Sequence, residues 1–303
     1  MQQAKSAKLE GFRRLFCPSW HRTFPFKSYL VNHEKKFVYC PIPKVACTSI
    51  KHWFYSLLSS VDSDECNTNL HSKLKDKYSL ARLRPQEAQQ ILASYYTFAF
   101  IREPFSRIES AYNNKFVRKQ KNTVNKITIP VIEWVYSNLR EKKIKKTKTF
   151  IYFDGSGRKY ETAVDPDIDY QQSINFREFV IYLCTHRDVS LNQHWKAQID
   201  FLPNGNPIDL FTLENLDYST SLLAQKLRIQ SIQLPTLNVS KNDSQHQVTR
   251  QNFSNLEAGD LRNIPSDSVE LYTSDLRTMI KKRYAKDFDL YEKATLQEKT
   301  HKN

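Results

Sequence analysis

The chain has 303 residues, 40% of them hydrophobic and 13% aromatic, which is enough to bury a core and excludes an intrinsically disordered protein. With 46 Lys and Arg against 32 Asp and Glu, its formal charge of +14 favours an anionic partner such as nucleic acid, a membrane surface, an acidic glycan or a phosphorylated cofactor. The five scattered cysteines form no disulfide framework or CxxC zinc motif, and the N-terminus has no apolar run of spanning length, so we expect a cytoplasmic protein.

Strand-like and helix-like segments alternate along most of the chain. Residues 1–36 are predicted to be a basic N-terminal arm, and residues 37–303 one domain with a basic insertion at about 119–170. Alternation of this kind predicts an α/β fold with an open parallel β-sheet flanked by helices. In chain order we expect a strand (37–41), helices (48–59 and 85–94), a strand (96–101), a helix from Pro104 to Phe116, an ordered segment (174–183), a strand (207–214) and a final amphipathic helix (268–284).

A lysine and two hydroxyls stand at the first junction between strand and helix. The backbone N–H groups at the start of a helix are unpaired and carry partial positive charge, so they can bind phosphate or sulfate oxygens. Thr48 and Ser49 would add hydroxyl donors, and Lys44 would add a positive charge. The alternative is that Thr48 or Ser49 merely caps the helix and that Lys44 is solvated. The candidate anion-binding residues are Lys44, Val45, Ala46, Cys47, Thr48 and Ser49.

An arginine follows the second strand of the predicted sheet. Arg102 stands at its end and Ser110 lies eight residues later, on a helical face with Arg107 and Asn114 that is opposite the apolar face. Arg102 and Ser110 could hold a second phosphate, although an arginine at a strand end is as often an ion-pair partner. Ligands of open α/β sheets bind beyond the carboxyl ends of the strands, so the two junctions together predict a ligand with two separated anionic groups.

Both junctions resemble those of a known enzyme family. The stretches "PKVACTS" (43–49) and "IREPFSRIESAYNNKF" (101–116) are similar to the 5′-phosphosulfate loop and the 3′-phosphate element of the carbohydrate sulfotransferases, most closely the HNK-1 and chondroitin/dermatan 4-O-sulfotransferase branch. The likeness covers roughly residues 37–118 and 174–291. It continues through "NLHSK" (69–73), "NQHWKAQ" (192–198), "IDLFTLENL" (208–216) and "YAKDFDLY" (284–291).

The resemblance implies a P-loop-like sulfotransferase fold and a defined reaction. The co-substrate would be 3′-phosphoadenosine 5′-phosphosulfate (PAPS), and the acceptor a hydroxyl of a neutral or acidic sugar or glycoconjugate; neither a metal nor nucleic acid is expected. Lys44, Thr48 and Ser49 would hold the 5′-phosphosulfate, and Arg102 and Ser110 the 3′-phosphate. Transfer would be an in-line displacement in which charge stabilisation and positioning supply most of the rate.

The base that accepts the proton of the acceptor hydroxyl is expected to be a histidine. His71 in "NLHSK" lies between the two anion-binding elements in sequence, where sulfotransferases commonly place their base. His194 in "NQHW" is a second candidate for the base, or for orienting the acceptor, and His52 is a third. Each could instead be a structural or surface histidine.

Two departures from the animal relatives affect the expected location and acceptor. Those relatives are Golgi proteins with an N-terminal anchor and tend to have paired cysteines before the strand at 207–214, and this sequence shows neither. Both features favour a cytoplasmic, bacterial-type member whose acceptor differs from a finished extracellular glycan.

Two other classes of function would place different demands on the sequence. A nucleotide-dependent phosphotransferase would need a glycine-rich G-x-x-x-x-G-K-[ST] loop, which the chain lacks. A non-catalytic polyanion-binding protein would use the basic run "REKKIKKTK" (140–148), which could also guide a polyanionic acceptor or be an ordinary solvated segment.

Overall fold

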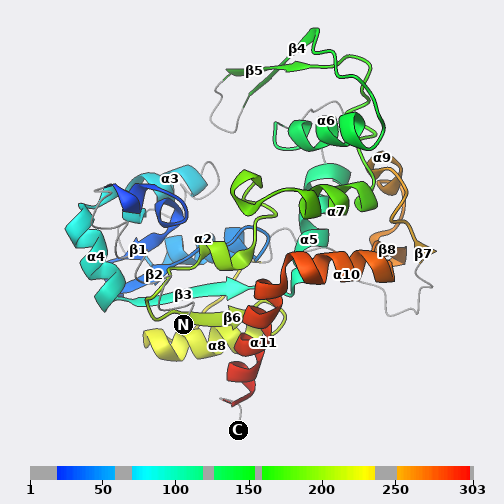
Figure 1. Cartoon of the computed structure of the whole chain (residues 1–303). Helices are drawn as coiled ribbons and strands as arrows, with labels where there is room; N and C mark the ends of the chain where they lie inside the picture. Colours follow the sequence, from blue (N-terminus) through cyan, green and yellow to red (C-terminus); the bar gives the residue numbers. More distant parts are fainter. Residues whose placement is uncertain (1–18, 59–69, 119–125, 154–158, 236–250, 301–303) are drawn as a thin grey trace. The chain divides into compact units, whose positions relative to one another are not determined.

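Two compact units make up the computed structural model, which describes residues 19–58, 70–118, 126–153, 159–235 and 251–300 (Figure 1). The first unit comprises residues 1–103, 197–237 and 286–303. The second comprises residues 104–196 and 238–285. The first unit contains the central sheet, and the second is mainly helical.

The sheet of the first unit has four strands in the order β1, β2, β3, β6. β1 (Leu30–Asn32) pairs with β2 (Phe37–Tyr39) in antiparallel orientation. β2, β3 (Tyr96–Ile101) and β6 (Asp209–Thr212) are parallel to one another. The predicted parallel sheet is therefore confirmed, and the antiparallel edge strand β1 was not predicted. Parallel pairing places the carboxyl ends of β2, β3 and β6 at one edge.

Helices cover both faces of this sheet. Figure 1 shows α2 (Cys47–Ser56) and α3 (Leu70–Tyr78) on one side and α8 (Leu216–Leu227) on the other. The predicted apolar face of α2 is buried, since Ile50, Trp53 and Phe54 are at most 4% exposed. Within its described residues, this unit also contains α4 (Pro85–Ser94), α11 (Ala285–Thr300) and the short η1 (Trp20–Arg22), η2 (Phe26–Ser28), η4 (Leu80–Arg82) and η7 (Gln198–Phe201).

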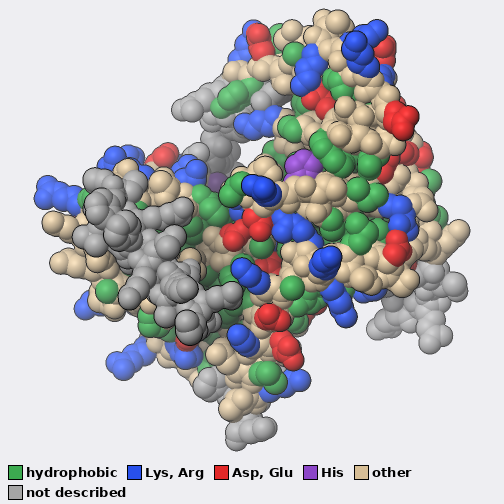
Figure 2. Space-filling model, viewed as in Figure 1, with side chains coloured by type: hydrophobic (Ala, Val, Ile, Leu, Met, Phe, Trp, Pro, Cys, Tyr) green, Lys and Arg blue, Asp and Glu red, His purple; other side chains and the backbone are tan. Residues whose placement is uncertain are grey.

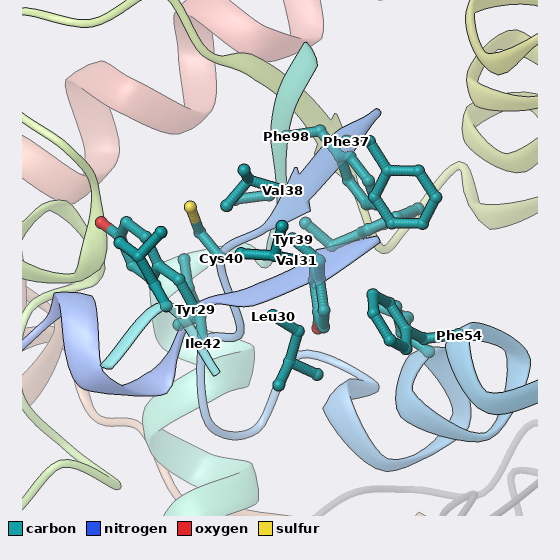
Figure 3. Packing of buried hydrophobic residues seen from close by; sticks show 14 of the residues in the cluster. Tyr29, Leu30, Val31, Phe37, Val38, Tyr39, Cys40, Ile42, Phe54 and Phe98 are labelled. Carbon is teal, nitrogen blue, oxygen red and sulfur yellow. The ribbon is translucent and has the colours of Figure 1, made fainter. Parts of the chain in front are cut away.

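An aromatic core lies between the sheet and α2. Figure 3 shows Phe37, Tyr39 and Phe98 from the strands beside Phe54 of α2. The ring of Phe37 packs edge-on against Phe54 at 5.6 Å, and the ring of Tyr39 stacks on Phe98 at 5.4 Å. Burial of these rings contributes to the hydrophobic stabilisation of the sheet.

Part of the predicted N-terminal arm belongs to this core. Trp20, Phe26 and Tyr29 are buried, and the Tyr29 hydroxyl donates to the carbonyl of Phe201 at 2.8 Å. The run of aromatic residues at 20–29 thus has a packing role rather than that of an arm. Residues 1–18 lie outside the described part.

The second unit has an aromatic core of its own. Tyr112, Phe116, Phe179 and Trp195 pack together, with ring centroids 5.1 to 6.0 Å apart for the Tyr112–Phe116, Phe116–Phe179 and Phe116–Trp195 pairs. Asn175 caps α7 in a reciprocal capping box with Glu178. Where the structure describes this unit, its helices are α5 (Pro104–Tyr112), a π-helical turn (Asn113–Val117), α6 (Ile129–Asn138), α7 (Phe176–Thr185), α9 (Ala258–Leu261), α10 (Ser274–Arg283), η6 (Asp188–Ser190) and η8 (Ser266–Ser268).

The predicted insertion contains regular structure that the sequence analysis missed. It includes α6 and an antiparallel hairpin of β4 (Lys148–Phe153) and β5 (Lys159–Val164). The predicted turn "DGSGRK" connects these two strands, and residues 154–158 lie outside the described part. Two further short strands, β7 (Gln251–Asn252) and β8 (Val269–Glu270), pair in parallel.

The C-terminal prediction was wrong in its boundaries. The single helix expected over 268–284 is β8 followed by α10, and α11 then continues to Thr300. Elsewhere the differences are small: the strand expected at 207–214 spans 209–212, and the helix expected at 48–59 spans 47–56.

Candidate active site

The segment from Cys40 to Ala46 connects the carboxyl end of β2 to α2. Lys44 and Ala46 have positive backbone φ angles of 70° and 44°. Side chains with a Cβ lose about 1–2 kcal/mol in this left-handed region, so packing must hold the loop in place. Ile42 and Val45 provide that packing, since both are at most 1% exposed. A left-handed residue followed by a helix turns successive N–H groups toward a common point, which is the geometry of an anion-binding nest.

The helix that follows this loop has no side-chain cap. Its N-cap is Ala46, and Thr48 and Ser49 are its second and third residues. The alternative that Thr48 or Ser49 caps α2 is therefore wrong. Ser49 is 5% exposed and Thr48 is half-buried. The first N–H groups of α2 thus have no capping side chain to accept from them, as an anion site requires.

Arg102 lies next to this loop, at the end of the neighbouring strand β3. Its Nη1 donates to the carbonyl oxygen of Lys44 at 3.4 Å. Its backbone N–H donates to Oε1 of Gln198 at 3.0 Å, and its carbonyl accepts from Nε2 of the same side chain at 2.8 Å. The structure therefore brings together two cationic residues that are 58 positions apart in sequence, both at the carboxyl edge of the parallel sheet.

Ser110, the proposed partner of Arg102, belongs to α5 in the second unit and is half-buried. The prediction that Arg107 lies with it on a helical face opposite the apolar face was wrong. Arg107 is only 1% exposed, and its Nη1 donates to the carbonyl of Lys196 at 2.9 Å. The role of Ser110 in phosphate binding stays a prediction.

His71 contacts a lysine that the sequence analysis did not single out. His71 lies in the first turn of α3, and its Nδ1 is 3.0 Å from Nζ of Lys51 on α2. Loss of water around the ring lowers the pKa of His71 to about 4, and the charges of Lys51 and His52 add to this effect. Burial likewise lowers the pKa of Lys51. His71 is therefore neutral near pH 7.

The contact between Lys51 and His71 also selects a tautomer. An ammonium group can only donate, so Nδ1 of His71 accepts and the ring proton is on Nε2 while Lys51 is charged. In this form Nε2 is a hydrogen-bond donor. His71 can offer a lone pair at Nε2 only when Lys51 has lost its proton and accepts from Nδ1–H instead. Lys51 is three residues after Thr48 in α2, and this helical spacing could have identified it from sequence.

His194 in the second unit is held in the opposite tautomer. The oxygen Oδ1 of Asn192 accepts from the backbone N–H of His194 at 3.1 Å and lies 2.6 Å from its Nδ1. Because an amide oxygen only accepts, Nδ1 carries the proton and the lone pair of the neutral ring is on Nε2. Asn192 thus keeps His194 in the form that a general base needs.

The basic run at 140–148 is partly engaged within the second unit. Arg140 binds the carboxylates of Glu178 and Glu257, Lys142 Nζ donates to the carbonyl of Asp167, and Lys146 pairs with Glu133. The segment is thus a loop fixed by its own basic side chains, whereas Lys143, Lys145 and Lys148 are exposed. Figure 2 shows Lys and Arg interspersed with Asp and Glu over the visible face rather than gathered in one patch.

The described residues offer neither a helix that could span a bilayer nor a cluster that could bind a metal. None of their helices is long and apolar enough to cross a bilayer. No group of three or more His, Cys, Asp or Glu side chains within those residues is arranged to hold a metal ion. The cytoplasmic location and the metal-free reaction stay predictions.

Comparison with known proteins supports the predicted resemblance. Carbohydrate sulfotransferase 11 of Rattus norvegicus is 26% identical over 197 residues, which are 61% of this chain and 46% of that protein. Carbohydrate sulfotransferase 14 of Homo sapiens is 28% identical over 178 residues, or 59% of this chain and 40% of that protein. Carbohydrate sulfotransferase 12 of Mus musculus is 24% identical over 260 residues, or 75% and 58%.

The chain spans about half the length of the curated relatives it matches. No solved structure gives a significant match. Among protein families, residues 27–294 match the one described as the sulfotransferase family. Since this match extends over most of the chain and includes both junctions of the candidate site, the chain belongs to the sulfotransferase family.

Proposed function

We propose that the chain transfers a sulfuryl group from PAPS to a hydroxyl of a carbohydrate or glycoconjugate. The observation that carries this proposal is the contact between the Arg102 guanidinium and the Lys44 carbonyl, which joins the uncapped start of α2 to the end of β3. This pair supplies two positive charges and a set of N–H donors at one sheet edge. The names of the matched relatives support sulfate as the transferred group and a carbohydrate as the acceptor.

The residues at the two junctions would hold different groups of the donor. The backbone N–H groups of Val45, Ala46 and Cys47, and the hydroxyls of Thr48 and Ser49, would bind the 5′-phosphosulfate. Lys44 would stabilise the negative charge that grows on the departing phosphate. Arg102 would hold the 3′-phosphate as a charge-assisted donor, and the part of Ser110 in binding this phosphate stays a prediction.

Transfer forms one sulfur–oxygen bond and breaks another. The acceptor hydroxyl oxygen attacks sulfur, the bond from sulfur to the phosphate oxygen breaks, and the hydroxyl proton passes to a histidine. The hydrogen bonds of the two candidates give different expectations: the base form of His71 requires an uncharged Lys51, whereas Asn192 holds His194 in the base form. Turnover of His71→Gln and His194→Gln is measured at saturating donor. The base is the histidine whose replacement lowers kcat more.

The proposal is tested by ligand-induced thermal stabilisation. Adenosine 3′,5′-bisphosphate should raise the Tm of the wild type, and ATP with magnesium should raise it less. Lys44→Ala and Arg102→Ala should keep the fold and reduce turnover at least 100-fold. Preference for ATP with magnesium, or near-normal turnover in either variant, would contradict the proposal.

The acceptor can be identified with the same protein. A screen of sugar nucleotides, lipid-linked sugars and acidic oligosaccharides with labelled donor would identify carbohydrates that gain sulfate. If polyanions bind with a steep salt dependence that Lys44→Ala does not change, and no carbohydrate is labelled, the non-catalytic polyanion-binding function gains support.

A further inference from the structure

A single buried glutamine holds both backbone polar groups of Arg102. Gln198 is fully buried, with Oε1 accepting the Arg102 N–H at 3.0 Å and Nε2 donating to the Arg102 carbonyl at 2.8 Å. The two bonds fix the orientation of the amide, because the N–H can only donate and the carbonyl can only accept. They therefore restrain Arg102 just where β3 has ended and strand pairing no longer holds the chain.

Gln198 is in turn held by a buried carboxylate. Asp287, in the first turn of α11, is 1% exposed, and its two oxygens accept the backbone N–H groups of Gln198 at 2.7 Å and Ile199 at 3.0 Å. Charge-assisted bonds to buried backbone groups are worth about 1.5–3 kcal/mol each. A continuous set of hydrogen bonds therefore runs from α11 through η7 to Arg102.

We propose that Gln198 and Asp287 are positioning residues that aim the Arg102 side chain at the 3′-phosphate of the donor. The proposal rests on the proposed function, since it takes Arg102 as the ligand of that phosphate. Arg102 has a long, flexible side chain, and the affinity of a guanidinium for phosphate depends on geometry that a loose backbone would not keep. Gln198 and Asp287, together called the clamp, fix that backbone before any ligand binds.

The same helix offers a matched control. Glu298 of α11 is also a buried carboxylate, 2% exposed, and it accepts from the backbone N–H of Thr212 at 2.8 Å and from the hydroxyl of Ser219 at 2.7 Å. Its bonds reach β6 and α8 rather than Arg102. Glu298→Gln and Asp287→Asn thus make similar chemical changes in one helix and differ in whether the clamp is affected.

The experiment compares two ligands that differ only in the 3′-phosphate. Dissociation constants of adenosine 3′,5′-bisphosphate and adenosine 5′-monophosphate are measured by calorimetry for wild type, Arg102→Ala, Gln198→Met, Asp287→Asn and Glu298→Gln. Gln198→Met keeps the side-chain volume and removes both hydrogen bonds, and Gln198→Asn serves as a milder second variant should it not fold.

We expect Gln198→Met and Asp287→Asn to weaken the bisphosphate about tenfold and the monophosphate less than twofold. Glu298→Gln should lower Tm and leave both dissociation constants unchanged. Two results would refute the positioning role alone. One is an equal loss of affinity for both ligands in Gln198→Met. The other is that Gln198→Met and Asp287→Asn keep the full preference for the bisphosphate over the monophosphate while Arg102→Ala abolishes it. A wild type that does not prefer the bisphosphate would instead refute the donor site.

Discussion

The contact between Lys51 and His71 leads to a prediction about titration. Replacing Lys51 by Met keeps the unbranched stem and removes the positive charge 3.0 Å from Nδ1 of His71. A nearby positive charge opposes protonation of the ring, so its removal must raise the pKa of His71 from its value of about 4. The direction of the change does not depend on which histidine is the base.

The size of this pKa change follows from Coulomb's law at a partly solvated site. Unit charges about 4 Å apart interact by about 1 kcal/mol in water and about 4 kcal/mol at an effective dielectric constant of about 20. The ring of His71 has lost part of its water, but the side chain still lies at an exposed position, so the interaction is screened and the lower value applies. About 1.4 kcal/mol corresponds to about one pKa unit. This is under half of the difference between 6.5 and about 4, in agreement with loss of water being the larger cause.

The assay is a histidine titration by NMR, with the His71 signal assigned from its loss in His71→Gln. We expect the pKa of His71 to rise to about 5 in Lys51→Met. Lys75→Met is the matched control, because Lys75 lies on α3 with His71 but acts electrostatically on Lys51. The reasoning is refuted if Lys51→Met leaves the pKa unchanged, if Lys75→Met raises it equally, or if nitrogen shifts show the Nδ1–H tautomer in the wild type near pH 7.

Two further predictions concern the loop and the second unit. Ala46→Val places a β-branched residue at a φ of 44° and should weaken adenosine 3′,5′-bisphosphate binding about tenfold. Ala46→Gly, which tolerates this φ, should change the dissociation constant less than twofold. Equal effects of the two substitutions in calorimetry would exclude a backbone cause. Arg140→Met leaves Glu178 and Glu257 facing each other and should cost about 2 kcal/mol of unfolding free energy at pH 7.5. Burial already raises the pKa of Glu257, so the folded variant binds protons more readily than the unfolded chain. The stability that Arg140→Met loses relative to the wild type should therefore be smaller at pH 5 than at pH 7.5. An equal loss at both pH values in urea denaturation would contradict this reasoning.

The parallel sheet and the loop at Lys44 could be predicted because they depend on local patterns. The apolar strand at 96–101 and the periodic face of α2 each signal their structure within a few residues. The hairpin of β4 and β5 was missed because β5 alternates between exposed and only half-buried residues, so its two faces differ little in polarity. β1 was missed because its three residues are too short for a periodicity to show.

Contacts between distant segments could not be predicted in this way. Gln198 and Asp287 both lie in stretches that resemble the family, yet nothing in either stretch indicates that one binds the other. Lys51 pairs with a histidine that is 20 residues later, on another helix. Pairings of this kind depend on tertiary packing, which a single sequence does not encode locally.

The C-terminal helix, which the sequence analysis overlooked, connects these distant parts. Asp287 and Glu298 are 11 residues apart, or about three turns of α11, so they lie on one face of the helix. One restrains Arg102 through Gln198 and the other binds Thr212 directly. Arg102 follows Ile101, which pairs with Thr212 in the sheet. The helix therefore holds the carboxyl ends of two adjacent parallel strands. Of its two carboxylates, Asp287 is the one whose hydrogen bonds reach Arg102, which gives the segment "YAKDFDLY" a role at the proposed donor site without contact with the donor.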